Sequence, residues 1–174
     1  FSDSTNAMNA LPLASQACRC CGASAGPVFR ATVLGHDVAF YECAQCGYVQ
    51  TETPYWLGEA YGDALGASDT GIVRRNLRNT RIVVALLGVM GRWKLPVLDF
   101  AGGAGLLVRL LRDAGVDAWW QDKYSQNILA RGFEYAGQPV GLVTAFEVME
   151  HLVNPCEGLA EMAARADAVL VSTE

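Results

Sequence analysis

The 174-residue sequence lacks several features that mark particular classes of protein. Although 52% of its residues are hydrophobic, no apolar run reaches the ~18 residues that a membrane-spanning helix needs. Its 13 lysines and arginines are outnumbered by 18 acidic residues, and the net charge of −5 argues against general nucleic-acid binding. No basic segment followed by an apolar run marks a secretory signal, so we expect a cytoplasmic protein without membrane association.

Four of the six cysteines form two matching motifs. Residues 18–22 and residues 43–47 each read C-x-x-C-G, and paired motifs at this spacing predict a closed, tetrahedral structural zinc site. The predicted ligands are Cys18, Cys21, Cys43 and Cys46. The alternatives are two disulfides, which are rare in the cytosol, or free buried thiols. Cys20 and Cys156 are left outside the pairing.

Two short strands are predicted between the cysteine motifs, at residues 28–33 and 38–41, around a turn signal at residues 35–37. This segment resembles a zinc ribbon. We assign the ribbon to residues 15–52, after a tail of residues 1–14.

Downstream of the ribbon, predicted strands and helices alternate. The strands are expected at 95–100, 116–121, 140–145 and 168–172, and the helices at 104–114, 125–131 and 155–166. This alternation predicts an α/β fold, a Rossmann-like, doubly wound and mostly parallel sheet, over residues 95–174. Residues 131–140 leave little room for the usual third strand. A helix at 72–89 is expected within a linker or lid of residues 53–94.

The most informative stretch is residues 97–105, Val-Leu-Asp-Phe-Ala-Gly-Gly-Ala-Gly, which predicts a buried strand, a tight turn and a helix start. Asp99 falls near the carboxyl end of the strand, where ligands lie in open parallel sheets. Gly103 and Gly105 lack a Cβ and would let the backbone approach a ligand. Val108 stands where the dinucleotide fingerprint needs its third glycine. The alternative is an ordinary strand-to-helix turn without a ligand.

The pattern D-x-A-x-G-x-G over residues 99–105 resembles motif I of the class I S-adenosylmethionine (SAM) methyltransferases, with Ala101 in place of the first glycine. Asp122 follows Gly105 by 17 residues and ends the second predicted strand. In nucleotide-binding parallel sheets, an acidic residue at such a position accepts hydrogen bonds from the hydroxyl groups of the ribose. Asp122 is otherwise a turn residue or a helix cap.

A further block, F-E-x-x-E-H-x-x-N-P at residues 146–155, resembles the segment after the fourth strand in many small-molecule class I methyltransferases. There the segment borders the cofactor and faces the acceptor pocket. Glu147 and His151 are four residues apart and are expected to share a helix face. His151 is a candidate general base. Alternatively, Glu147, Glu150 and His151 bind a metal ion, or they only line the pocket.

Methyl transfer from SAM to a small molecule is the function that the resemblance implies, with a sugar, a nucleotide-sugar or a natural-product intermediate as acceptor. It implies catalytic roles for His151 and Glu147. The cofactor-binding residues that it implies are Asp99, Ala101, Gly103, Gly105, Asp122, Lys123, Phe146 and Glu147. Tyr61 and Arg75 are candidate lid residues over SAM, with simple packing as the alternative.

The resemblance extends through the strand expected at 168–172, which corresponds to the fifth strand of the family, and lacks the two further strands of a complete class I methyltransferase. We therefore expect an incomplete sheet, whose open edge favours a homo-oligomer. Two other functions stay open. One is a zinc-ribbon binding module with an inactive Rossmann scaffold, and the other is a nicotinamide-dependent oxidoreductase.

Overall fold

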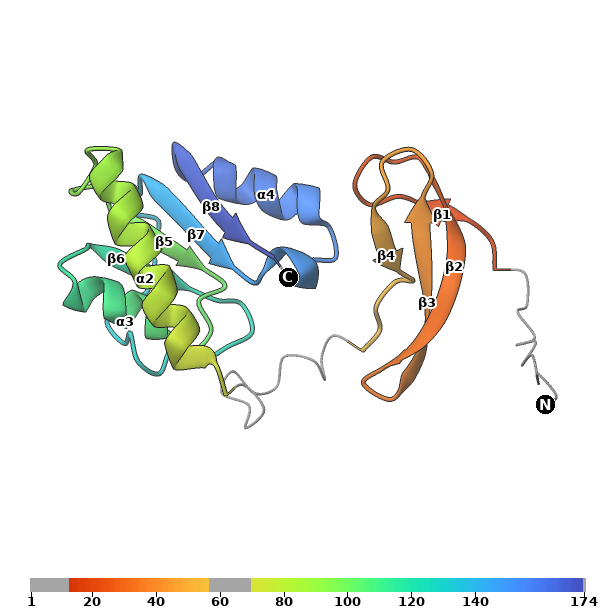
Figure 1. The fold of residues 1–174 in the computed structure, drawn as a ribbon, viewed down its shortest axis with the longest axis horizontal. Helices are drawn as coiled ribbons and strands as arrows, with labels where there is room; N and C mark the ends of the chain where they lie inside the picture. The colour runs from red at the N-terminus through yellow and green to blue at the C-terminus, as the bar shows by residue number, and fades with distance from the viewer. Residues whose placement is uncertain (1–12, 57–69, 174) are drawn as a thin grey trace, which may run out of the picture. The chain divides into compact units, whose positions relative to one another are not determined.

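The computed structural model describes residues 13–56 and 70–173, which belong to two compact units, Phe1–Trp56 and Leu57–Glu174 (Figure 1). The fold is mixed α/β, with an antiparallel sheet in the first unit and a parallel sheet in the second. None of the described helices is both long enough and apolar enough to cross a bilayer.

The first unit is a curled antiparallel sheet in the order β1-β2-β3-β4. Its strands are β1 (Gln16–Ala17), β2 (Ser24–Val33), β3 (His36–Cys43) and β4 (Val49–Thr51). The predicted strands at 28–33 and 38–41 are confirmed within the longer β2 and β3. Val33 pairs with His36, which leaves Leu34 and Gly35 as a two-residue turn with φ of 50° and 84°. Two positive φ values are typical of the type I′ hairpin, and glycine adopts one of them without strain.

The core of the first unit is small. One cluster of buried residues comprises Cys18, Ala25, Ala39, Tyr41 and Cys43, with Leu13, Ala23 and Tyr48 packed against them, and Val38 and Trp56 are buried outside this cluster. Two of the five buried residues of this cluster are cysteines of the C-x-x-C motifs, so the cluster and these motifs occupy the same part of the unit.

The second unit contains a four-stranded parallel sheet in the order β6-β5-β7-β8. Its elements are α2 (Ile72–Val89), β5 (Val97–Phe100), α3 (Leu106–Asp113), β6 (Ala118–Gln121), β7 (Leu142–Phe146), the short 3₁₀ helix η1 (Met149–His151), α4 (Pro155–Ala163) and β8 (Ala168–Ser172). The predicted parallel sheet and the helix over 72–89 are therefore confirmed. Pro155 begins α4, where its missing N–H has no helical partner to lose.

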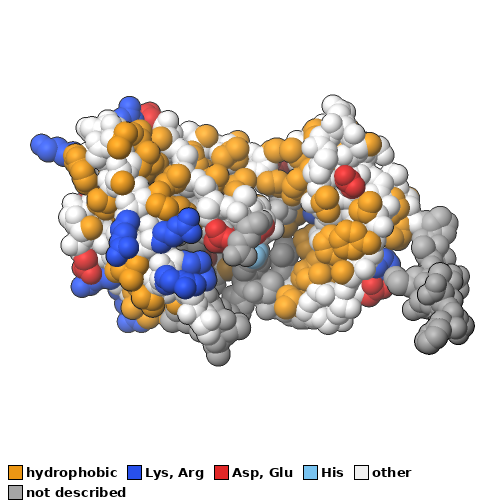
Figure 2. All heavy atoms as spheres, viewed as in Figure 1, with side chains coloured by type: hydrophobic (Ala, Val, Ile, Leu, Met, Phe, Trp, Pro, Cys, Tyr) orange, Lys and Arg blue, Asp and Glu red, His pale blue; other side chains and the backbone are white. Residues whose placement is uncertain are grey.

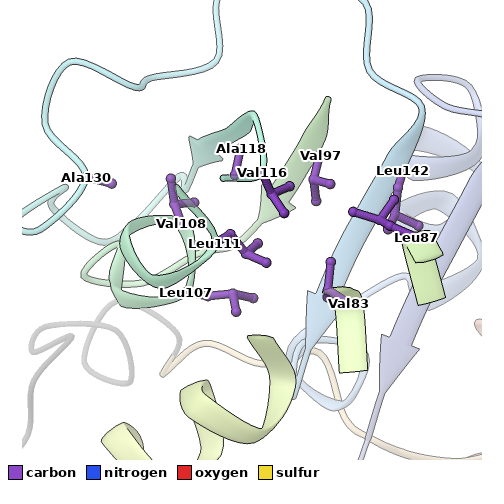
Figure 3. Close-up of a cluster of buried hydrophobic side chains, with 10 residues drawn as sticks. All are labelled: Val83, Leu87, Val97, Leu107, Val108, Leu111, Val116, Ala118, Ala130 and Leu142. Atoms are coloured by element: carbon purple, nitrogen blue, oxygen red, sulfur yellow. The ribbon is translucent and has the colours of Figure 1, made fainter. Parts of the chain in front are cut away.

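Different helices pack against the two faces of this sheet. Val97 and Leu142 face the helices α2 and α3, in a cluster completed by Val83, Leu87, Leu107, Val108, Leu111, Val116, Ala118 and Ala130 (Figure 3). Their neighbours Leu98 and Val143 pack instead with Met162 of α4. Because successive residues of a strand point to opposite faces, α2 and α3 cover one face of the sheet and α4 covers the other.

The predicted helix over 125–131 is wrong, because these residues form turns. Side chains form hydrogen bonds with the backbone N–H groups of this segment. Asp122 Oδ1 accepts from the N–H groups of Tyr124 (2.7 Å) and Ser125 (2.8 Å). Asn127 Oδ1 likewise accepts from the Ala130 N–H at 2.9 Å. Such local bonds compete with helical ones. The missing third strand is reduced to a single parallel bridge between Trp120 and residue 134.

Candidate functional site

The first unit contains a cluster of four cysteine thiols. The Sγ atoms of Cys18, Cys21, Cys43 and Cys46 all lie within 4.8 Å of one another, and we call this group the four-cysteine cluster. The Cys18–Cys46 pair is 3.7 Å apart and the Cys21–Cys43 pair is 3.5 Å apart. A tetrahedral zinc ion with Zn–S bonds of ~2.3 Å needs S–S separations of about 3.8 Å. The cluster is therefore compatible with a structural zinc ion.

The two C-x-x-C-G motifs fold identically. In the first, the Gly22 N–H donates to the Cys18 carbonyl (2.8 Å), and the Cys18 N–H donates to the Ala23 carbonyl (2.7 Å). The same two bonds recur in the second motif, at 2.9 Å for Gly47 and 3.0 Å for Cys43. Gly22 and Gly47 have φ of +77° and +72°, a conformation that side chains with a Cβ rarely adopt. This shared turn directs both thiols of each motif toward the four-cysteine cluster.

Hydrogen bonds around the cluster divide its thiols by acidity. Despite burial, which raises it, the pKa of Cys18 is lowered to about 7 by hydrogen bonds from the backbone of Cys21 and Cys20. Despite a backbone hydrogen bond from Ala23, which lowers it, the pKa of Cys21 is raised to about 12 by its contacts with the thiols of Cys46 and Cys43. Thiolates are the metal-binding form, so the binding of a metal ion releases the protons that these groups hold.

Cys20 lies inside the first motif but outside the cluster. Its side chain is exposed, and its backbone N–H donates to Cys18 Sγ at 3.4 Å. Gln50, which is buried in β4, supports the same motif: its Oε1 accepts from the Arg19 N–H (2.8 Å), and its Nε2 donates to the Ala17 carbonyl (3.0 Å). Gln50 was not foreseen from the sequence, where a polar residue in a short strand carries no distinguishing signal.

In the second unit, three hydrogen bonds join the glycine turn after β5 to the end of β6. The Gly102 N–H donates to the Gln121 carbonyl (3.0 Å), and the Gly103 N–H donates to Asp122 Oδ2 (2.9 Å). In return, Trp120 Nε1 donates to the Gly103 carbonyl (2.9 Å). The glycine turn and Asp122, both singled out in the sequence, thus meet at the carboxyl ends of neighbouring strands.

The turn uses three residues with positive φ, namely Ala101 (56°), Gly103 (54°) and Gly105 (86°). A Cβ built on Gly103 would meet no atom within 4 Å, which is compatible with the predicted approach of a ligand. A Cβ on Gly105 would lie only 2.8 Å from Asn127 Oδ1 and 2.9 Å from the Ala130 Cβ. Gly105 therefore makes room for the segment that replaces the predicted helix.

Asp99 lies beneath the glycine turn and is only 4% exposed. Its Oδ1 accepts a hydrogen bond from Thr144 Oγ1 of β7 at 2.9 Å. Burial raises the pKa of Asp99 to about 7; the hydrogen bond from Thr144 opposes this rise, and the charge of Asp122 adds to it. A Cβ on Gly102 would lie 2.7 Å from Asp99 Oδ2, so this glycine is needed for the carboxyl group to fit.

The carboxylate of Asp122 already accepts three backbone N–H groups, those of Gly103, Tyr124 and Ser125. A carboxylate offers about four acceptor positions. Asp122 therefore acts as a turn residue, as one of the two sequence interpretations expected. It retains acceptor capacity for about one ligand hydroxyl group.

The Glu147–His151 pair is arranged differently from the prediction. The shared helix face is wrong, because η1 begins only at Met149 and Glu147 precedes it with φ of 55°. Ser172 at the end of β8 holds Glu147 instead: its carbonyl accepts from the Glu147 N–H at 3.1 Å, and its Oγ donates to Oε1. Among the described residues, Glu147 Oε2 is a buried atom without a hydrogen-bond partner. His151 is the exposed last residue of η1.

The structure describes three of the four remaining predicted residues. Phe146 packs against the cluster between the sheet and α2 and α3. Lys123 is exposed beside Asp122, with its Nζ 5.3 Å from the centre of the Tyr124 ring. Arg75 is exposed in the first turn of α2. Tyr61 lies outside the described residues. In the part of the chain that the structure describes, only the four-cysteine cluster brings together three or more metal ligands, so Glu147, Glu150 and His151 form no such group.

Trp120, Thr144 and Ser172 are positioning residues that the sequence analysis missed. Two of them did carry a signal: Thr144 interrupts an apolar strand, and a half-buried Trp120 needs a partner for its indole N–H. No known protein family matches the chain, and no curated protein matches it significantly. Function must therefore be inferred from the residues themselves.

Proposed function

We propose that the second unit binds SAM at the carboxyl ends of β5 and β6 and transfers its methyl group to a small-molecule acceptor. The observation that carries this proposal is the 2.9 Å hydrogen bond from the Gly103 N–H to Asp122 Oδ2. It brings the glycine turn and the acidic residue after β6 into contact, as the motif I resemblance requires. Ligands of open parallel sheets bind at this edge.

The chemistry of the edge suits a cationic cofactor. SAM supplies an electrophilic methyl group on a positively charged sulfur, so the protein has mainly to orient the acceptor and exclude water. Asp122 and Glu147 place two partly exposed carboxyl groups near the carboxyl ends of β6 and β7. In this proposal Asp122 accepts a hydrogen bond from one ribose hydroxyl group, Gly103 admits the methionine part, and His151 takes a proton from the acceptor.

The first unit, in the same proposal, holds a structural zinc ion through Cys18, Cys21, Cys43 and Cys46. Four thiolates complete the tetrahedron, so no position remains for a substrate. The role of this ion is to fold the unit.

One observation favours a binding module over an enzyme, namely that three backbone N–H groups already occupy the carboxylate of Asp122. In that case the edge is a structural turn. A nicotinamide site is less well supported, because Val108 is fully buried where close packing of helix on strand would call for glycine.

Isothermal titration of S-adenosylhomocysteine into the zinc-loaded protein tests the proposal. We expect micromolar binding that Asp122→Asn weakens at least tenfold, because the substituted amide cannot accept on both of its atoms. Asp117→Asn is the matched control, since Asp117 forms an exposed ion pair with Arg112 at 3.0 Å, away from the glycine turn.

Absence of binding by the wild-type protein would contradict SAM recognition and leave the binding module. Binding of NADH in its place would select the oxidoreductase. Equal affinity of the wild type and Asp122→Asn would remove Asp122 from the site while retaining the cofactor.

A further inference from the structure

The basic residues of the second unit are concentrated on one helix. The stretch 70–98 contains six lysines and arginines, and all 18 acidic residues of the chain lie outside it. Arg74, Arg78 and Arg81 follow each other at helical spacing on α2 and are exposed. They form a stripe with axial steps of ~6 and ~4.5 Å. Figure 2 shows Lys and Arg side chains gathered on this side of the second unit.

These three arginines differ from the other arginines in their partners. Among the described residues, no carboxylate or carbonyl group accepts a hydrogen bond from Arg74, Arg78 or Arg81. Seven arginines outside α2 each donate a hydrogen bond to, or form an ion pair with, a carboxylate or carbonyl group: Arg19, Arg30, Arg92, Arg109, Arg112, Arg131 and Arg165. The stripe is thus the place where the described fold leaves guanidinium groups without an acceptor.

Exposed aliphatic side chains flank the stripe, namely Val73, Leu77 and Ile82. Phosphate backbones are bound by broad positive surfaces, and aliphatic neighbours add little to such contacts. Arginine mixed with apolar side chains is instead typical of the centre of a protein–protein interface. The stripe therefore fits a polypeptide that presents carboxylates and an apolar residue.

Helix α4 of the same chain presents such a surface. Glu157 and Glu161 are exposed four residues apart and share one face of the helix, and the exposed apolar residue Ala160 adjoins this face. Glu157 accepts from Asn154 and Glu161 from Arg165, and both carboxylates keep further acceptor positions. Since α4 and α2 cover opposite faces of one sheet, α4 cannot reach the stripe of its own chain.

We infer that the arginine stripe of α2 binds helix α4 of a second copy of this chain. Because the two surfaces lie on opposite faces, the contact is head-to-tail and leaves a free surface at each end of the assembly. One helix pair buries less than a standard interface, so the association is weak and sensitive to salt.

Sedimentation velocity of the whole chain tests this inference at about 200 μM protein, a concentration suited to a small interface. Two variants remove the contact from its two sides: Arg74→Glu/Arg78→Glu/Arg81→Glu and Glu157→Arg/Glu161→Arg. The matched control, Lys94→Glu/Lys123→Glu/Arg131→Glu, changes the net charge as much as the first variant does. Circular dichroism checks that every variant retains its helices.

At low salt we expect oligomers of the wild type and the control, and at least tenfold weaker association of each charge-reversal variant alone. An equimolar mixture of the two variants restores association, because each acidic helix then meets a basic one. About 0.5 M salt dissociates all the assemblies, since screening then acts within several ångströms.

A wild type that stays monomeric at low salt would overturn the inference. Association that both reversals leave intact would also overturn it and would assign the contact to another surface, such as the β8 edge. Monomers that bind duplex DNA through the same three arginines would overturn it in favour of a phosphate-binding role.

Discussion

The two units are stabilised by different means. The buried cluster of the first has five residues, two of which are cysteines of the four-cysteine cluster. The second fills both faces of its sheet with aliphatic side chains from α2, α3 and α4. Small domains with little apolar core commonly depend on a metal ion or on disulfides, whereas a larger core stabilises a fold by itself. We therefore expect the two units to respond to different perturbations.

The largest expected effect is that of metal removal on the first unit alone. Metal binding in small zinc domains contributes ~10–16 kcal/mol, which exceeds what this small core can replace. A chelator, or the substitution Cys21→Ser, is expected to abolish amide protection in β2 and β3 while leaving β5 and β7 protected. Hydrogen exchange with mass spectrometry measures both units in one sample.

Cys20→Ser is the control for that experiment, because Cys20 lies next to Cys21 but outside the cluster. It should retain one zinc ion per chain by elemental analysis. Simultaneous loss of protection in both units on chelation would show that the units do not differ in this way.

The substitution Leu111→Ala is expected to affect the second unit alone. It truncates a fully buried side chain of α3 in the core between the sheet and the helices α2 and α3. Such truncations cost about 2–5 kcal/mol through lost burial and the cavity left behind. Urea unfolding should show this loss in the second unit, with zinc content unchanged. Val89→Ala should change stability by less than about 0.5 kcal/mol, because Val89 is 88% exposed. Similar losses for both variants would argue against a well-packed core.

The buried carboxyl group of Asp99 makes the stability of the second unit depend on pH. Its pKa is about 7 in the folded state, against ~3.9 when unfolded. Between these values the folded state holds a proton that the unfolded state releases, so the free energy of unfolding falls as pH rises from about 4 to 7.

We expect wild-type stability to fall by about 2–4 kcal/mol relative to Asp99→Asn across this range, and to change little from this group above it. Urea unfolding at a series of pH values measures the difference. Parallel curves for the two proteins would mean that Asp99 titrates normally despite its burial.

The smallest expected effect concerns the turn of one cysteine motif. Gly47→Ala places a Cβ in open space but at φ of +72°, which should destabilise the first unit by about 1 kcal/mol. Gly26→Ala is the matched control, because Gly26 also has open space around it but no positive φ. Zinc affinity in competition with a chelator should separate the two variants. Equal affinities would mean that the turn tolerates alanine.

Sequence reasoning succeeded where the signal is local. The spacing of the cysteines predicted which four thiols come together, and the alternation of apolar runs predicted a parallel sheet. It failed at residues 125–131, because the apolar pattern there is helical while Asp122 and Asn127 capture the backbone through their side chains. The same Asp122 was correctly placed at the end of its strand.

The geometry around Glu147 was beyond local reasoning for a different reason. Its positive φ accompanies hydrogen bonds with Ser172, which lies 25 residues later in the chain. The link between Trp120 and Gly103 also joins residues from different strands. Spacing alone cannot reveal contacts that exist only once the strands have paired. Residues that position a site are therefore harder to predict than those with a recognisable motif.

The order of strands in the second unit has a consequence for the newly made chain. The central strand β5 pairs with β6 on one side and with β7 on the other, and β7 is synthesised some 45 residues after it. The first unit, by contrast, closes all its pairings within residues 16–51. On the ribosome the first unit can therefore pair all its strands once residue 51 has emerged, whereas the apolar strand β5 still lacks its partner β7. That interval, set by topology, is when the chain is most exposed to aggregation.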